Sequence, residues 1–320
     1  MLSARVLYIN MTGVTCEIMK NLVLAGVAAV ICDDRPYPAA VRETPCYFFH
    51  AEDMEKAAAE MVSTNADDGV AEPNAKKAKR IPVTVASVIQ PRVEELNPLL
   101  SGRNSIEERS LASLPDDYFT QFDAIVASRL TVSEAKRISS SLQKSKEGKL
   151  FILTDTFGLD GCAHLDFGSQ HTYRREMGKD KLSDFMKIDP YLSMTDMLDV
   201  PLADVKGRWD TTVPRELAFQ RLLMDYWGQS KNGQANQNFT DFTKEWLLSN
   251  NLSSVAVSWD MSQLAAVAAH PEVSAVSAVL GGMLGNEAIK LLTGKGEGVN
   301  NVMLFNGLEG SCRIFLLKPK

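Results

Sequence analysis

Residues 5–34 constrain the fold of this chain more than any other segment. Residues 5–10 (RVLYIN) are a short β-rich apolar run that ends in turn-forming residues, which predicts a buried strand. Apolar side chains then recur at helical spacing, at Val14, Ile18, Leu22 and Ala25. Gly26 stands where a helix C-terminal cap is expected, and residues 28–32 (AAVIC) predict a second strand. This strand–helix–strand unit predicts a parallel sheet with a right-handed crossover.

The alternation of strands and helices continues to about residue 155. Residues 122–127 and 149–155 predict two more strands, separated by a helix at 132–143. A further helix is expected over residues 83–96, although Pro91 should kink or split it. Strands that alternate with helices in this way predict an open α/β fold.

The second half of the chain reads as mostly helical. Helices are predicted at 214–227, ended by Gly228, and at 239–252. A long apolar helix at 273–292 carries three closely spaced glycines: Gly281, Gly282 and Gly285. Such small residues allow another backbone to approach, either inside the fold or across a subunit boundary. The chain ends in VMLF, NGLEG and CRIFLL, which together predict a β-hairpin.

Residues 53–80 differ from the rest in composition. They are rich in Ala, Glu, Asp, Asn and Lys and poor in large apolar residues, which predicts a disordered insertion. The insertion ends in AKKAKR at residues 75–80, a basic cluster of the kind that nuclear import receptors read. A solvated charge run is the alternative interpretation.

Composition and charge exclude several classes of function. The net charge of −6 gives no basic field for nucleic acid or anionic membranes. No apolar run approaches the roughly 20 residues of a membrane span, and Arg5 leaves no room for a signal peptide, so an intracellular protein is expected. Five cysteines without a C-x-x-C pair argue against a disulfide framework or a zinc site and favour reduced, mostly buried thiols. The four histidines lack metal-ligand spacing.

The loop after the first strand is where a nucleotide site would be. Such loops carry G-x-G-x-x-G, followed about 20 positions later by an acidic residue that binds ribose. Gly13 and Asp33 have this separation, but Asn10 and Thr15 stand where neighbouring glycines are expected. Side chains there would obstruct the approach of a pyrophosphate. The pattern predicts a nucleotide pocket that has lost its nucleotide, and no other catalytic or metal motif is evident.

Several stretches together resemble one family, the ThiF-like adenylating enzymes that activate ubiquitin, SUMO and their relatives. Residues 5–34 resemble the first strand–helix–strand unit of that fold. Residues 118–128 and 150–168 resemble its middle strands, and residues 278–310 resemble its final helix and hairpin. The resemblance implies a Rossmann-like pseudo-adenylation domain with a mixed sheet, made of residues 1–174 and 271–320, with a mainly helical subdomain at 175–270. The chain length favours the smaller, SUMO-type subunits of the heterodimeric members.

The resemblance also implies a division of labour. A larger partner subunit would bind ATP and Mg²⁺, form the adenylate of the modifier and carry the thioester cysteine. Active members have an aspartate seven residues after the F-D pair, whereas counting from Asp123 leads to Leu130. This chain is therefore expected to bind no cofactor or metal and to supply no catalytic residue.

Some questions stay open at this stage. Relatives carry an N-terminal arm with an arginine, and a truncated start and a missing arm are both compatible with a first strand at residue 5. The basic cluster implies a nuclear and cytoplasmic protein. The alternatives are a subunit of a neddylation-type enzyme and an autonomous nucleotide-binding Rossmann enzyme.

Overall fold

A computed structural model describes most of the chain. The described residues are 3–37, 46–50, 52–53, 83–145, 148–178, 181–205, 213–231, 238–252, 266 and 272–318. The predicted insertion at 53–80, apart from Asp53, lies outside them, and so does the basic cluster at 75–80.

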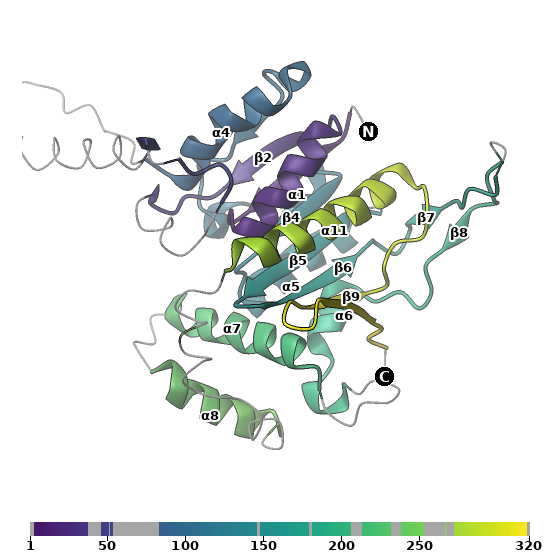
Figure 1. The fold of residues 1–320 in the computed structure, drawn as a ribbon. Helices are drawn as coiled ribbons and strands as arrows, with labels where there is room; N and C mark the ends of the chain where they lie inside the picture. Colours follow the sequence, from purple (N-terminus) through teal and green to yellow (C-terminus); the bar gives the residue numbers. More distant parts are fainter. Residues whose placement is uncertain are drawn as a thin grey trace, which may run out of the picture.

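An eight-stranded mixed sheet organises the molecule (Figure 1). Its order is β10-β9-β6-β5-β4-β1-β2-β3. The five strands from β5 to β3 pair in parallel, and each of the neighbouring pairs β5–β6, β6–β9 and β9–β10 is antiparallel. The strands are β1 (Arg5–Ile9), β2 (Ala28–Cys32), β3 (Ser105–Ile106), β4 (Ala124–Ala127), β5 (Leu150–Phe157), β6 (Asp160–Asp166), β9 (Val302–Asn306) and β10 (Ser311–Phe315). This arrangement confirms the predicted Rossmann-like α/β fold.

Helices cover both faces of the sheet and create two cores. One face packs against α1 (Gly13–Leu24), α4 (Val85–Leu96) and α11 (Ser274–Thr293), and the other against α5 (Val132–Gln143), α6 (Met194–Asp199), α7 (Arg215–Lys231) and α8 (Phe239–Ser249). Strand β1 shows how the sequence divides between them. Its alternate residues Val6 and Tyr8 enter the first core, and Leu7 and Ile9 enter the second, because successive strand side chains point to opposite faces.

The glycines of α11 serve the first core. Helices α1 and α11 lie side by side on the sheet (Figure 1). A Cβ on Gly281 would lie 2.5 Å from the Cβ of Glu17, and one on Gly285 would lie 3.0 Å from the Cβ of Asn21. Gly282, in contrast, has no neighbour within 4 Å of such a Cβ. Of the two interpretations that the sequence left open, the structure therefore assigns Gly281 and Gly285 to close packing inside the chain.

The structure corrects two predictions about helices. Helix α7 continues through Gly228 to Lys231, since one interior glycine costs a helix only about 1 kcal/mol. Of the two effects expected of Pro91, the structure excludes the split, because α4 continues through this residue. Helix α11, which is half buried in the fold, has the length and composition of a membrane span, whereas the sequence analysis expected no such segment. Its packing along α1 is that of a core helix.

Residues 175–205 are not purely helical. They begin within a two-stranded hairpin of β7 (Thr172–Tyr173) and β8 (Met186–Lys187), which projects to the right in Figure 1. Helix α6 and the 3-10 turn Leu202–Asp204 follow. Helices α6 and α7 then pack on the sheet through the second core.

Candidate functional site

The candidate site lies at the carboxyl ends of β1, β2 and β4. Strand order reverses between β1 and β4, and in open α/β sheets ligands bind in the crevice at such a point. The fold brings together four of the predicted pocket residues here: Asn10, Gly13, Thr15 and Asp33. The fifth, Leu130, is fully buried in the second core beside the same loops.

The backbone amides of the loop after β1 all donate to the protein itself. The amide of Asn10 donates to the carbonyl of Cys32 at 3.1 Å, and that of Thr12 donates to Oγ1 of Thr15 at 2.7 Å. The amides of Met11 and Gly13 donate to carboxylates, as described below. A phosphate-binding loop needs these N–H groups for the ligand. Here four successive donors are already used.

Asp33 holds the loop closed from β2. Its Oδ2 accepts from the Met11 amide at 2.7 Å, and Arg35 binds both of its oxygens at 2.9 and 2.6 Å. The same guanidinium donates to the Met11 carbonyl at 2.8 Å. The carboxylate is almost completely buried. An acidic residue that binds ribose must offer an oxygen to the ligand, whereas both oxygens of Asp33 are bound within the chain.

Asn10 joins the loops that follow β1 and β4. Its Nδ2 donates to the carbonyl of Ser128 at 2.9 Å, so the side chain bridges the crevice between the two strands. Its backbone is left-handed, with φ of 59°, a conformation that asparagine tolerates better than most residues do. Asparagine thus allows the backbone conformation of a glycine loop, while its side chain fills the space that a glycine would leave open.

Asp155, at the carboxyl end of β5, was not identified from the sequence. It accepts from Oγ of Ser128 at 2.8 Å, from the amide of Arg129 at 2.7 Å and from Nε2 of Gln220 at 2.7 Å. Burial raises its pKa against these hydrogen bonds. Its position as the last residue of the strand predicted at 149–155 was a signal that could have revealed it. The carboxylate of Asp155 therefore binds the chain's own loop after β4.

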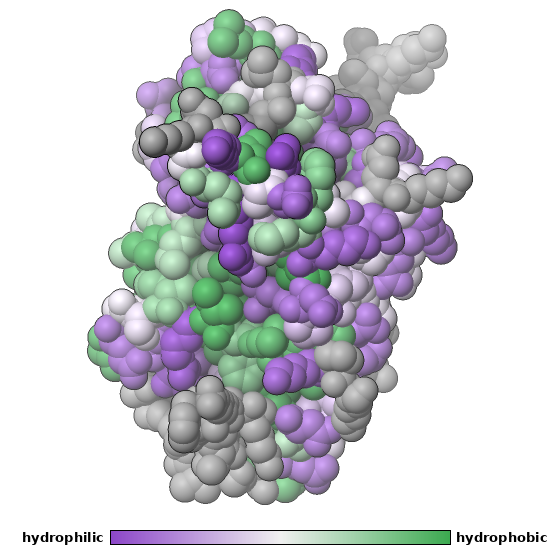
Figure 2. All heavy atoms as spheres, turned by 90° about the vertical axis from the view of Figure 1, so that its right-hand side faces the viewer, coloured by the Kyte–Doolittle hydropathy of each residue, from purple (hydrophilic) through white to green (hydrophobic). Residues whose placement is uncertain are grey.

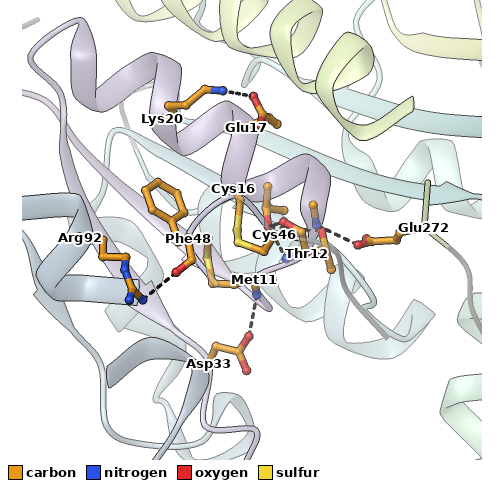
Figure 3. Close-up of a disulfide and its surroundings, with 12 residues drawn as sticks. Met11, Thr12, Cys16, Glu17, Lys20, Asp33, Cys46, Phe48, Arg92 and Glu272 are labelled. Carbon is orange, nitrogen blue, oxygen red and sulfur yellow. Dashed lines mark hydrogen bonds and ion pairs between the residues drawn. A yellow bond between two sulfur atoms is a disulfide. The ribbon is translucent and has the colours of Figure 1, made fainter. Parts of the chain in front are cut away.

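Glu272 fills the anion position at the start of α1. Its Oε2 accepts from the Gly13 amide at 2.9 Å, where the helix N-terminus would favour a phosphate (Figure 3). Burial raises the pKa of this carboxyl to about 7, and Asp155 adds to the effect, against the influence of Arg129, Gly13 and Arg35. Nothing in the local sequence could have revealed a contact across 259 positions.

The pocket residues do not fit a nucleoside triphosphate or its metal. The amides are occupied, a carboxylate lies where phosphate would bind, and buried Leu130 offers no metal ligand. Among the described residues no group of three or more His, Cys, Asp or Glu side chains could hold a metal ion.

The buried histidine of β6 carries no charge. Burial is the main cause that lowers the pKa of His164 to about 3, and the nearby positive charge of Arg221 lowers it further, so the imidazole is neutral.

Replacing Glu272 by glutamine tests the buried carboxyl. The folded-state pKa lies above the usual value, so the wild type binds an extra proton when folded and loses stability as the pH rises from about 4.5 to about 7. Glutamine can still accept from Gly13 and does not titrate. We expect Glu272→Gln to gain about 1–2 kcal/mol relative to wild type between pH 5 and pH 8, measured by urea unfolding. Parallel stability curves would contradict the assignment.

The cysteines require a correction. Cys32 and Cys162 are buried free thiols, as predicted, and Cys312 is half-buried. Cys16 of α1 and Cys46, however, form a disulfide, whereas reduced thiols were expected throughout (Figure 3). Their spacing of 30 positions and their different elements gave no signal in the sequence.

Comparison with known proteins finds similarity to one kind of enzyme subunit. No protein-family model matches the chain. Over 317 residues, however, it is 24% identical to SUMO-activating enzyme subunit 1A of Arabidopsis thaliana, with 96% of this chain and 86% of that protein covered. It is 26% identical over 347 residues to SUMO-activating enzyme subunit 1 of Xenopus tropicalis, with 99% and 90% covered. The chain is similar over nearly its whole length to SUMO-activating enzyme subunit 1.

A third comparison agrees with the first two. SUMO-activating enzyme subunit 1 of Danio rerio is 24% identical over 333 residues, with 96% of this chain and 87% of that protein covered. The similarity to subunit 1 thus extends through residues 175–270, where the sequence alone showed only a general helical character. The resemblance to the smaller SUMO-type subunit, inferred from separate segments, is confirmed.

Proposed function

We propose that this chain is the non-catalytic subunit of a SUMO-activating enzyme and works as a heterodimer with a larger catalytic subunit. In this assembly the partner binds ATP and Mg²⁺, adenylates the C-terminus of SUMO and transfers it to its own cysteine. The relatives are named as subunits of such enzymes. The single observation that carries the non-catalytic role is the self-occupied pocket, in which Gly13 donates to Glu272 and Met11 donates to Asp33.

An exposed apolar surface beside the pocket supports a protein partner. Leu159, Val279 and Leu308 are 47%, 49% and 82% exposed. Leu308 lies close to Leu159 because the Gly307 amide donates to the Leu159 carbonyl, and Gly307 in turn lies beside Val276 of α11, one turn before Val279. The edge strand β10 adds Ile314, which is 62% exposed. A separate view, Figure 2, shows further apolar residues gathered at mid-height on the face that lies to the right in Figure 1. Exposed apolar patches and unpaired strand edges are typical of association surfaces.

Co-expression with candidate larger subunits tests the proposal. The expected result is a stable complex that loads SUMO onto the cysteine of the larger subunit in the presence of ATP. If that complex loads a different ubiquitin-like modifier, the result would favour the neddylation-type alternative. Binding and turnover of a nucleotide by the isolated chain would favour the autonomous enzyme instead.

Nuclear as well as cytoplasmic localisation is part of the proposal. It depends on the basic cluster at 75–80. Replacing Lys76, Lys77, Lys79 and Arg80 by alanine should move a fluorescent fusion toward the cytoplasm, because import receptors read clustered positive charge. SUMO loading by the complex should stay at the wild-type level. Unchanged nuclear accumulation would assign the cluster to a solvated charge run.

A further inference from the structure

The Cys16–Cys46 disulfide joins helix α1 to a segment that approaches from outside the helix layer. Cys16 lies in the first turns of α1 and is buried, whereas Cys46 is half-buried. Their Cα atoms are 6.3 Å apart, within the range that a disulfide spans. The bond therefore needs no displacement of either backbone.

Noncovalent contacts also hold the segment that contains Cys46 against α1 and α4. The Phe48 side chain is buried in the first core, and Lys20 of α1 lies 5.1 Å from the centre of the Tyr47 ring. Arg92 of α4 donates to the Phe48 carbonyl at 2.8 Å and forms an ion pair with Asp53 (Figure 3). These contacts hold Cys46 near Cys16 in the thiol form too. The two thiols are therefore placed to react with each other.

The remaining cysteines are poorly suited to oxidation. Burial raises the pKa of Cys32 to about 12, with further effects of Glu107, Asp33 and Asp34. Burial likewise raises the pKa of Cys162, with Glu216 and Asp155 adding to it, and burial raises that of Cys312. Thiolates are the reactive form, so the raised pKa values make these three thiols less reactive. Cys16 and Cys46, in contrast, lie against each other, with their Cα atoms 6.3 Å apart.

We propose that Cys16 and Cys46 form a reversible redox pair that locks residues 46–50 onto the first turns of α1 under oxidising conditions. The inference rests on the proposed function in one respect: SUMO-activating enzymes of the nucleus and cytoplasm would work in reducing compartments, where disulfides are mostly transient and redox-sensing. The pair lies one turn from Gly13 and the loop described above.

The chemistry uses a peroxide as oxidant. Peroxide reaches the half-buried Cys46 thiolate first, transfers one oxygen to the sulfur and leaves as hydroxide. The Cys16 thiolate then attacks the sulfur of this sulfenic acid, the S–S bond forms and a second hydroxide leaves. Two protons convert the hydroxides into water, so two thiolates and one peroxide give one disulfide and two waters. A dithiol reductant reverses the link by thiol–disulfide exchange.

Redox titration of the full chain tests the proposal. The reduced protein is equilibrated with glutathione buffers from reducing to oxidising, alkylated, and analysed by peptide mass spectrometry without reduction. We expect a linked Cys16–Cys46 peptide to replace the two alkylated cysteines reversibly while Cys32 and Cys162 stay thiols. Amide exchange of residues 47–50 should slow by about tenfold or more in the linked form, because opening is then restricted by a covalent bond.

Matched variants separate the pair from general oxidation. Cys46→Ser should abolish both the linked peptide and the change in amide exchange, whereas Cys312→Ser should leave both unchanged. Alkylation of both cysteines at every glutathione ratio, or a link that persists in the most reducing buffer, would overturn the proposal. Neither readout involves SUMO. Failure of the redox pair therefore leaves the proposed function standing, and a failure of SUMO loading leaves the pair standing.

Discussion

The isolated chain is expected to catalyse no SUMO-dependent exchange of pyrophosphate into ATP, whereas its complex with the larger subunit should catalyse it at full rate. Adenylation requires a triphosphate held in line with the attacking carboxylate and a metal that offsets its charge. In this chain the amides of Asn10 to Gly13 are used internally, and Leu130 stands where a metal ligand is expected. Without free backbone amides to bind the triphosphate and without a carboxylate to bind the metal, the isolated chain should show exchange only at background level.

The assembled complex provides the control. Asp33→Asn in this chain weakens the pairing with Arg35 and should lower stability by about 1–3 kcal/mol, yet exchange per assembled complex should persist. The corresponding aspartate substitution in the larger subunit should stop exchange. Robust exchange by the isolated chain, or its loss from an assembled Asp33→Asn complex, would show that the pocket is a working site.

Adjacent glycines of α11 should respond to alanine in opposite directions. Gly281→Ala places a methyl group 2.5 Å from the Cβ of Glu17 and 3.0 Å from the carbonyl oxygen of Val14. The helices must separate, so we expect a loss of about 1–3 kcal/mol in the free energy of unfolding. Gly282→Ala enters open space and should gain about 0.5–1 kcal/mol from helix propensity. Chemical denaturation of the two variants measures the difference.

The glycine pair also tests the role of α11. If Gly281 instead contacted only a partner subunit, Gly281→Ala would leave the isolated chain as stable as wild type and weaken the heterodimer. If Gly282→Ala leaves the chain stable but weakens the heterodimer, the open side of α11 belongs to the subunit interface. The stability and assembly measurements therefore have to be made on the same two proteins.

Local pattern was sufficient for much of the fold. The strand at 5–10, the helix that follows and the strand at 28–32 were all predictable, because a buried strand needs a short apolar run and a helix needs apolar residues at 3.6-residue spacing. Helix α5 has the predicted bounds, since Thr131 caps its N-terminus by accepting from the Glu134 amide. Gly228 misled the prediction because tertiary packing can offset the cost of one poor helix former.

The sequence by itself determined the α/β class and the loss of the glycine loop, because both depend on which residue types follow one another along the chain. Only the tertiary structure decided which groups accept from the amides of the loop after β1. Glu272 reaches Gly13 across 259 positions, and Cys46 reaches Cys16 across 30. Asp33 could be predicted as a pocket residue from its spacing, but its hydrogen bond with Met11 and its ion pair with Arg35 could not be predicted. Such partners are chosen by the three-dimensional path of the chain, and no local periodicity records that path.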